Sequence, residues 1–245
     1  MSPTSTLPNV EDLNPQKRLA LIQVLGAITY GELKAYNGAM EQSKLVESEQ
    51  DKKIYRKIAA EELRHHKGFS RRLEALGADI ERAMAPYKDS LDSYHSSKVT
   101  DPIAGAVAGY LGEGIASDML NWLKKVSDVE TSQFIDTVIE DETEHEQIAI
   151  EKLKDLIAST PLGWLKAQIG VQQMLFRMIR ASNPSSVKGP RSFGAFLKLG
   201  RSNDLVYALT TGMSKRVLSL DLGPRPLKLP KFAGKLPGLA FASPR

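Results

Sequence analysis

Two copies of the pair Glu-x-x-His constrain this chain more than any other feature. The first is Glu62 with His65, and the second is Glu142 with His145. Residues three apart share one face of a helix, so each pair can offer a carboxylate oxygen and an imidazole nitrogen to the same ion. One such pair alone is most often a helical ion pair on a solvated face, but its recurrence calls for another explanation.

A single glutamate precedes each pair at a matching distance. Glu32 lies 30 residues before Glu62, and Glu113 lies 29 residues before Glu142. Two antiparallel hairpins of long helices would bring each single glutamate level with its pair. These residues lie on apolar stripes, where four carboxylates and two imidazoles are prohibitively costly to bury unless they bind cations. The spacing predicts a metal site with the following ligands: Glu32, Glu62, His65, Glu113, Glu142 and His145.

Capping signals place long helices around this site. Asn14-Pro15 and Thr100-Asp101-Pro102 are starts in which a capping side chain precedes proline, Thr160-Pro161 opens another helix, and Gly77 is a stop. Between the second and third helices, residues 78–100 are less regular and long enough to cross over along a helix of about 45 Å. The expected helices cover 15–42, 48–76, 102–125, 128–158, 160–180 and, more weakly, 204–218.

The absence of cysteine narrows the chemistry. Among the 245 residues there is none, which excludes disulfides, thiolate nucleophiles, Fe–S clusters and cysteine-ligated zinc. Any metal must be held by Asp, Glu and His, and hard carboxylate oxygens with imidazole suit Fe or Mn. Four carboxylates nearly balance two divalent ions, so two iron ions are the expected cofactor, with Mn as the alternative.

The neighbours of the ligands have predicted roles as well. Glu61 and Asp141 each precede a ligand glutamate, and we expect each to accept the free ring N–H of the opposite hairpin's histidine. Four glycines surround Glu113, although each costs a helix about 1 kcal/mol relative to alanine. They provide either close helix packing or space for O2 and an organic substrate. If neighbouring helices cover these glycines, a ferroxidase, which oxidises iron itself, is favoured. The glycines are Gly105, Gly109, Gly112 and Gly114.

Charge divides the chain near residue 160. Residues 1–160 carry 19 Lys and Arg against 27 Asp and Glu, whereas residues 161–245 carry 14 against only Asp204 and Asp221. A basic region of this kind either meets a polyanion or docks on the acidic body of its own chain. The Pro- and Gly-rich tail from residue 221 is expected to be disordered in isolation. The first residues lack a signal-peptide pattern and no stretch has about 20 apolar residues, so we expect a soluble, cytoplasmic protein without a transmembrane segment.

The motifs resemble those of ferritin-like di-iron carboxylate proteins, in which two helices each give a Glu and two each give Glu-x-x-His. In detail they are similar to the bacterial MiaE-like family over about residues 12–180. The resemblance implies an all-α, ferritin-like four-helix bundle with one long crossover and a fifth helix, and leaves 181–245 as a basic extension. The motifs are Gly31-Glu32, Ala60-Glu61-Glu62-Leu63-Arg64-His65, Ala83-Met84-Ala85-Pro86-Tyr87, Leu91-Asp92-Ser93-Tyr94-His95, Gly112-Glu113-Gly114-Ile115-Ala116 and Asp141-Glu142-x-x-His145.

That resemblance implies an O2-dependent di-iron hydroxylase with an external electron donor, because the family's namesake hydroxylates a 2-methylthio-isopentenyl-adenosine base in tRNA. The same motifs are also similar to those of soluble acyl-carrier-protein desaturases, and the basic region would suit an acidic carrier as well as tRNA. A ferroxidase without organic substrate and a metal-stabilised binding module that meets nucleic acid or an anionic membrane are the other interpretations. The substrate, the electron donor, the choice of Fe or Mn and the formation of a dimer stay open.

Overall fold

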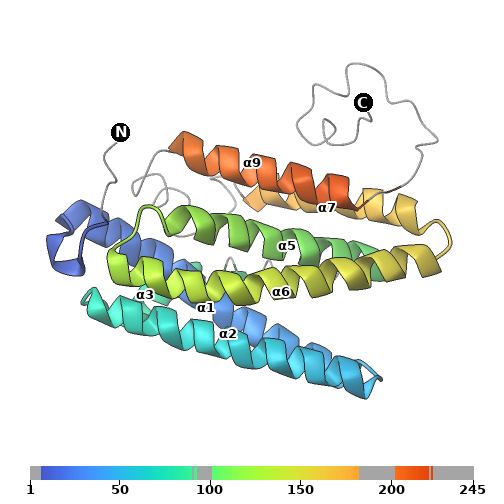
Figure 1. Cartoon of the computed structure of the whole chain (residues 1–245), viewed down its shortest axis with the longest axis horizontal. Helices are drawn as coiled ribbons and strands as arrows, with labels where there is room; N and C mark the ends of the chain where they lie inside the picture. Colours follow the sequence, from blue (N-terminus) through green and yellow to red (C-terminus); the bar gives the residue numbers. More distant parts are fainter. Residues whose placement is uncertain (1–6, 90, 93–100, 182–201, 221, 223–245) are drawn as a thin grey trace. The chain divides into compact units, whose positions relative to one another are not determined.

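The computed structural model describes residues 7–89, 91–92, 101–181, 202–220 and 222. Every regular element in this part of the chain is helical, and no strand occurs in it (Figure 1). The all-α prediction is therefore confirmed. The residues form two compact units, which are Met1–Ser97, Asn121–Asp141 and Val187–Asp204 in one, and Lys98–Leu120, Glu142–Ser186 and Leu205–Arg245 in the other.

Unit 1 begins with the helical hairpin of α1 (Pro15–Leu45) and α2 (Glu49–Ala75), preceded by the short 3-10 helix η1 (Val10–Asp12). Asn14 caps α1, because its side chain accepts a hydrogen bond of 2.8 Å from the backbone N–H of Lys17. Ser48 caps α2 in the same way, and Gly77, with φ of 76°, follows its end. The predicted starts of both helices are observed to within one residue.

The first part of α6 (Val129–Ser159) packs on α2 in unit 1. The rings of Phe69 and Phe134 meet edge to face, with centroids 4.9 Å apart. Gly68 makes room for this contact, because a Cβ atom there would lie 2.0 Å from Cζ of Phe134. Further along α2, Arg72 binds Asp128 at the start of α6. Contacts that move forward on one helix move backward on the other, so α2 and α6 are antiparallel.

The segment after α2, which was expected to be irregular, starts with α3 (Ile80–Met84) and the 3-10 helix η2 (Ala85–Tyr87). A Cβ atom at Gly26 of α1 would lie 2.2 Å from the carbonyl oxygen of Ala83, so the two backbones are in close contact. Further on, Asp92 accepts a hydrogen bond from the Tyr30 hydroxyl at 2.8 Å and lies 2.9 Å from Lys34 Nζ. This crossover segment is thus fixed along α1, while residues 90 and 93–100 lie outside the described part.

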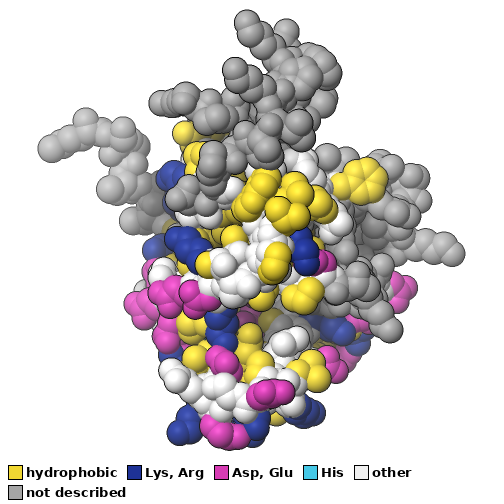
Figure 2. All heavy atoms as spheres, turned by 90° about the vertical axis from the view of Figure 1, so that its right-hand side faces the viewer, with side chains coloured by type: hydrophobic (Ala, Val, Ile, Leu, Met, Phe, Trp, Pro, Cys, Tyr) yellow, Lys and Arg dark blue, Asp and Glu magenta, His cyan; other side chains and the backbone are white. Residues whose placement is uncertain are grey.

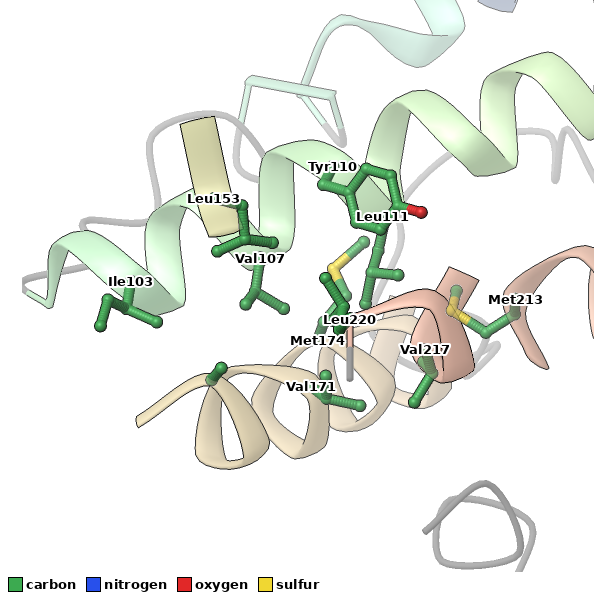
Figure 3. Close-up of a cluster of buried hydrophobic side chains, with 11 residues drawn as sticks. Ile103, Val107, Tyr110, Leu111, Leu153, Val171, Met174, Met213, Val217 and Leu220 are labelled. Carbon is green, nitrogen blue, oxygen red and sulfur yellow. The ribbon is translucent and has the colours of Figure 1, made fainter. Parts of the chain in front are cut away.

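Unit 2 contains most of α5 (Pro102–Leu123), the second part of α6, α7 (Gly163–Ala181) and α9 (Ser202–Ser219) from Leu205 onward. Figure 3 shows how apolar side chains of these helices converge in one buried cluster. Helix α9, for which the sequence gives only a weak helical pattern, takes part in this cluster through Met213 and Val217. The cluster comprises Ile103, Val107, Tyr110, Leu111, Leu153, Ala167, Val171, Met174, Met213, Val217 and Leu220.

The start of α7 differs from its prediction. Thr160-Pro161 suggested a helix from residue 160, but residues 160–162 form a turn in which the N–H of Gly163 donates to the carbonyl of Thr160 at 2.9 Å. Leu162 has a positive φ of 55°, which a helix cannot accommodate. The helix therefore begins three residues later, at Gly163.

Some hydrophobic side chains remain at the surface, as the face in Figure 2 shows. On and just before α7 the exposed side chains among those that the structure describes include Leu162, Leu165, Ile169 and Phe176. Helix α7 thus presents apolar side chains to solvent as well as to the buried cluster. Among the described helices, none combines the length and apolar character needed to cross a membrane.

Candidate metal centre

The hairpin of α1 and α2 brings together three predicted ligands. Nδ1 of His65 lies 3.5 Å from a carboxylate oxygen of Glu32 and 3.6 Å from one of Glu62. His65 and Glu62 are only 1% and 2% exposed. Their burial follows from position, since both lie on the stripe of α2 that continues through the buried residues Phe69 and Leu73.

The other ring nitrogen of His65 is held by α6. Its Nε2 lies 2.8 Å from Oδ2 of Asp141, and Arg64 donates to the same carboxylate. Burial by itself raises the pKa of Asp141, but the hydrogen bonds from His65 and Arg64 outweigh that effect and hold the pKa below its usual range. An ionised Asp141 accepts the proton on Nε2, which leaves the lone pair of Nδ1 directed at the glutamates.

Glu142, the next residue of α6, joins this group. One ligand atom from each of Glu32, Glu62, His65 and Glu142 can be chosen so that all four lie within 4.8 Å of one another. With metal–ligand bonds of about 2.1 Å, two donors on opposite sides of one ion are about 4.2 Å apart. The spacing and the donor set of three carboxylates and one imidazole therefore fit a divalent metal ion. Without a cation, several negative charges would be buried together, which is strongly unfavourable.

The second Glu-x-x-His pair repeats the local geometry of the first. Nδ1 of His145 lies 3.9 Å from a carboxylate oxygen of Glu142, and the two residues are 4% and 3% exposed. Glu113 lies on α5 and is half-buried. Within the described part of the chain, the group of four contains neither Glu113 nor His145. Their role as ligands remains a prediction, as does the complete set of six.

Glu61 was expected to accept a hydrogen bond from His145. In the structure its carboxylate lies 3.7 Å from Nζ of Lys57, one turn earlier on α2. The role of Glu61 toward His145 therefore also remains a prediction.

Sequence reasoning missed two arginines near these residues. Arg64 shares Asp141 with His65, and Arg216 of α9 binds Glu146, which follows His145. The side chain of Arg216 also explains one glycine beside Glu113, because a Cβ atom at Gly114 would lie 2.0 Å from Nε of Arg216. The position of Arg64 between Glu62 and His65 was a usable signal, whereas the pairing of Arg216 depends on the packing of α9.

The group of three glutamates and one histidine lies on helices, and every regular element of the described chain is helical. The protein therefore belongs to the class of helical proteins with a candidate carboxylate–histidine metal site. A family model described as a ferritin-like domain of actinomycetes matches residues 15–171, and the chain belongs to this family of ferritin-like domains. No curated protein matches the chain.

Proposed function

We propose that this protein is a di-iron oxidoreductase that uses O2. The observation that supports the proposal most is the buried group of Glu32, Glu62, His65 and Glu142, whose donor atoms are close enough to share metal ions. When bound, iron would supply the electrons and the Lewis acidity for the reaction with O2. Two metal ions would be held by the ligands Glu32, Glu62, His65, Glu113, Glu142 and His145.

The protein's own contribution would be charge, orientation and exclusion of water. The carboxylates neutralise the cations, and Asp141 fixes the ring of His65 so that Nδ1 faces Glu32 and Glu62. The exposures of 2% for Glu62 and 1% for His65 keep bulk water away from the donor atoms. Arg64 would hold Asp141 ionised, which preserves the tautomer of His65.

The principal candidate reaction is hydroxylation of an organic substrate. One C–H bond becomes C–OH, the second oxygen atom leaves as water, and an external donor supplies two electrons with two protons. The likeness to MiaE-like motifs and the basic residues after 181 favour a modified tRNA nucleoside as substrate. An acyl chain on a carrier protein is the alternative, in which the same oxidant and electrons would introduce a double bond. At Gly109 of α5 a Cβ atom would meet nothing within 4 Å, but this glycine is exposed, so the space there lies at the surface and does not bear on the substrate.

Oxidation of Fe(II) itself is a second candidate, and one observation favours it. Gly114, beside Glu113, is covered by the side chain of Arg216, so this glycine serves close packing and does not open space for an organic substrate. A ferroxidase would take Fe(II) as its substrate, pass the electrons to O2, and need no external reductant. Both candidates use the same ligands and differ in the source of the electrons.

Metal analysis of protein from iron-fed cells tests the proposal. We expect about two irons per chain in the wild type, and fewer in Glu62→Ala and His145→Ala. Glu140→Gln, at an exposed position of α6, is the matched control and should keep the wild-type content. A folded wild-type protein that binds no iron would refute both reactions. Repeated O2 consumption that requires a reductant and organic substrate would support the hydroxylase, whereas O2 consumption proportional to added Fe(II) alone would support the ferroxidase.

The tRNA interpretation needs its own test. Comparing modified nucleosides and lipids from cells with and without the protein separates the tRNA and acyl-chain substrates. A truncation after Leu222 removes five Lys and Arg but no acidic residue and keeps α9. If the tail contacts tRNA, the truncation should weaken binding and reduce its salt dependence, since each phosphate contact contributes to the slope. If the truncated protein binds tRNA as the full chain does, the tail after Leu222 does not contact tRNA.

A further inference from the structure

Arg216 of α9 makes a three-point polar contact in unit 2. Its Nε and Nη2 atoms donate to the two carboxylate oxygens of Glu146, at 2.8 and 2.9 Å. Its Nη1 atom donates to Oδ2 of Asp118 at 2.7 Å. One guanidinium group thus joins α5 and α6 to α9, with a two-point contact that fixes its orientation as well as its distance.

The contact lies next to predicted metal ligands on both helices. Glu146 directly follows His145 on α6, and Gly114, which directly follows Glu113 on α5, lies under the Arg216 side chain. A Cβ atom at Gly114 would lie 2.2 Å from Cδ of Arg216. Any residue larger than glycine at position 114 would overlap the Arg216 side chain and force it to move. It therefore couples the backbone beside Glu113 to the backbone beside His145.

A glycine of α9 completes the arrangement. A Cβ atom at Gly212, one turn before Arg216, would lie 1.8 Å from Oδ2 of Asp118 and 2.6 Å from Nη1 of Arg216. Burial raises the pKa of Asp118 even though Arg216 acts in the opposite direction, so this carboxylate is poorly solvated and depends on its partner. Removing Arg216 would leave two half-buried carboxylates without their shared cation, and α5 and α6 would move apart or admit water.

We propose that Arg216 is a positioning residue that holds Glu113 and His145 in register for the second metal ion. This inference rests on the proposed di-iron function. Arg216 acts through Glu146 and Gly114, which fix the adjacent backbone of α6 and α5. Helix α9 lies beyond the family match of residues 15–171, so the C-terminal region contributes to the metal site and is more than a basic appendage.

Anaerobic Fe(II) titration of the full chain, followed by equilibrium dialysis and metal analysis, tests the role of Arg216. Wild type should bind two ions. Arg216→Met keeps the apolar stem over Gly114 but lacks the guanidinium group, and should bind the second ion about 10- to 100-fold more weakly while keeping the first, the usual effect of losing an outer support of a metal ligand. Arg216→Lys, which retains the charge but not the two-point contact, should have an intermediate effect.

Lys166→Met is the matched control. Nζ of Lys166 lies 3.1 Å from Oδ2 of Asp101, so this pair also joins α5 to a neighbouring helix, but three turns away from Glu113. The control should bind both ions as wild type does. If Lys166→Met weakens the second ion equally, or if Arg216→Met weakens both ions alike, the effect is general destabilisation and the positioning role is overturned.

Two further results separate this inference from the proposed function. A wild type that does not bind two ions refutes the di-iron centre, and the role of Arg216 with it. A wild type that binds two ions, together with an Arg216→Met protein of equal affinity for both, refutes only the role of Arg216. Should Arg216→Met not fold by circular dichroism, Gly212→Ala displaces the same ion pair while keeping all charges. It must then weaken the second ion selectively, and unchanged binding would overturn the inference.

Discussion

Asp128 offers the sharpest test of how α2 and α6 are held together. It is fully buried at the start of α6. Its Oδ1 accepts from the backbone N–H of Thr131 at 3.0 Å and from Nη2 of Arg72 at 3.0 Å, and its Oδ2 accepts from the hydroxyl of Thr131 at 2.6 Å. The same carboxylate therefore caps one helix and pairs with the other. We predict that Asp128→Ala destabilises the protein more than the loss of an ordinary cap would.

The magnitude follows from the two lost interactions. Loss of the cap costs about 1 kcal/mol. Breaking a buried ion pair by removing one partner costs about 3–5 kcal/mol. Arg72 keeps a second partner, however, since its Nη1 lies 2.5 Å from Glu130, so we take about 2 kcal/mol for this part. Together they predict a loss of about 3 kcal/mol in the free energy of unfolding.

Urea denaturation followed by circular dichroism, with chelator present throughout, measures this loss. Asp128→Asn is the control, because it keeps an oxygen for the cap and removes the charge, and should lose about 1–2 kcal/mol. In the background of Arg72→Met, Asp128→Asn should cost at least about 1 kcal/mol less than in wild type, since the two residues are in contact.

A loss below about 0.5 kcal/mol for Asp128→Ala, which is the range of ordinary surface substitutions, would refute the reasoning. So would strict additivity of Asp128→Asn and Arg72→Met. Either result would mean that α6 is positioned on α2 by apolar packing alone.

Three further outcomes are expected. Gly68→Ala should lower the melting temperature, because the ring of Phe134 must move and overpacking costs about 1–3 kcal/mol; an unchanged melting temperature would show that the ring moves freely. Gly26→Ala should be more harmful, because its Cβ meets the backbone oxygen of Ala83, which cannot rotate away. Backbone hydrogen bonds from the first turn of α5 and the nearby lysine lower the pKa of Asp101 below 3.8, so its contribution to stability is present above that pH and is lost as the pH falls further. Asp101→Asn should thus lose less stability than wild type on acidification, which denaturation at neutral pH and near pH 3 would measure.

Much of the helical architecture follows from local signals. Asn14-Pro15, Ser48 and Gly77 set helix ends through caps made by the residues themselves, and these ends agree with the structure to within one residue. The start of α7 does not, because Leu162 adopts a backbone conformation that its sequence gives no reason to expect. Helix α3 was missed since its five residues are too few for a periodic pattern.

The candidate site, too, could be predicted where it depends on local spacing and could not where it depends on tertiary packing. Helical spacing and apolar stripes were sufficient to select Glu62, His65 and Glu142, which the structure places close together with Glu32. Contacts that depend on the packing of distant segments could not be predicted this way. The covering of Gly114 by Arg216 is an example, because it requires α9 to pack on α5, and no periodicity within either helix contains that information.

One short stretch of α6 has a consequence for how this sequence can vary. Asp141 binds His65, Glu142 belongs to the group of four, and Glu146 binds Arg216, all within six consecutive residues. Each residue inserted into a helix turns everything after it by about 100°. A single insertion between Asp141 and Glu146 would therefore separate these partnerships from one another, whereas substitutions on the outward face would leave them intact. We expect natural variants to change this stretch by substitution and to place length changes at the turns between helices.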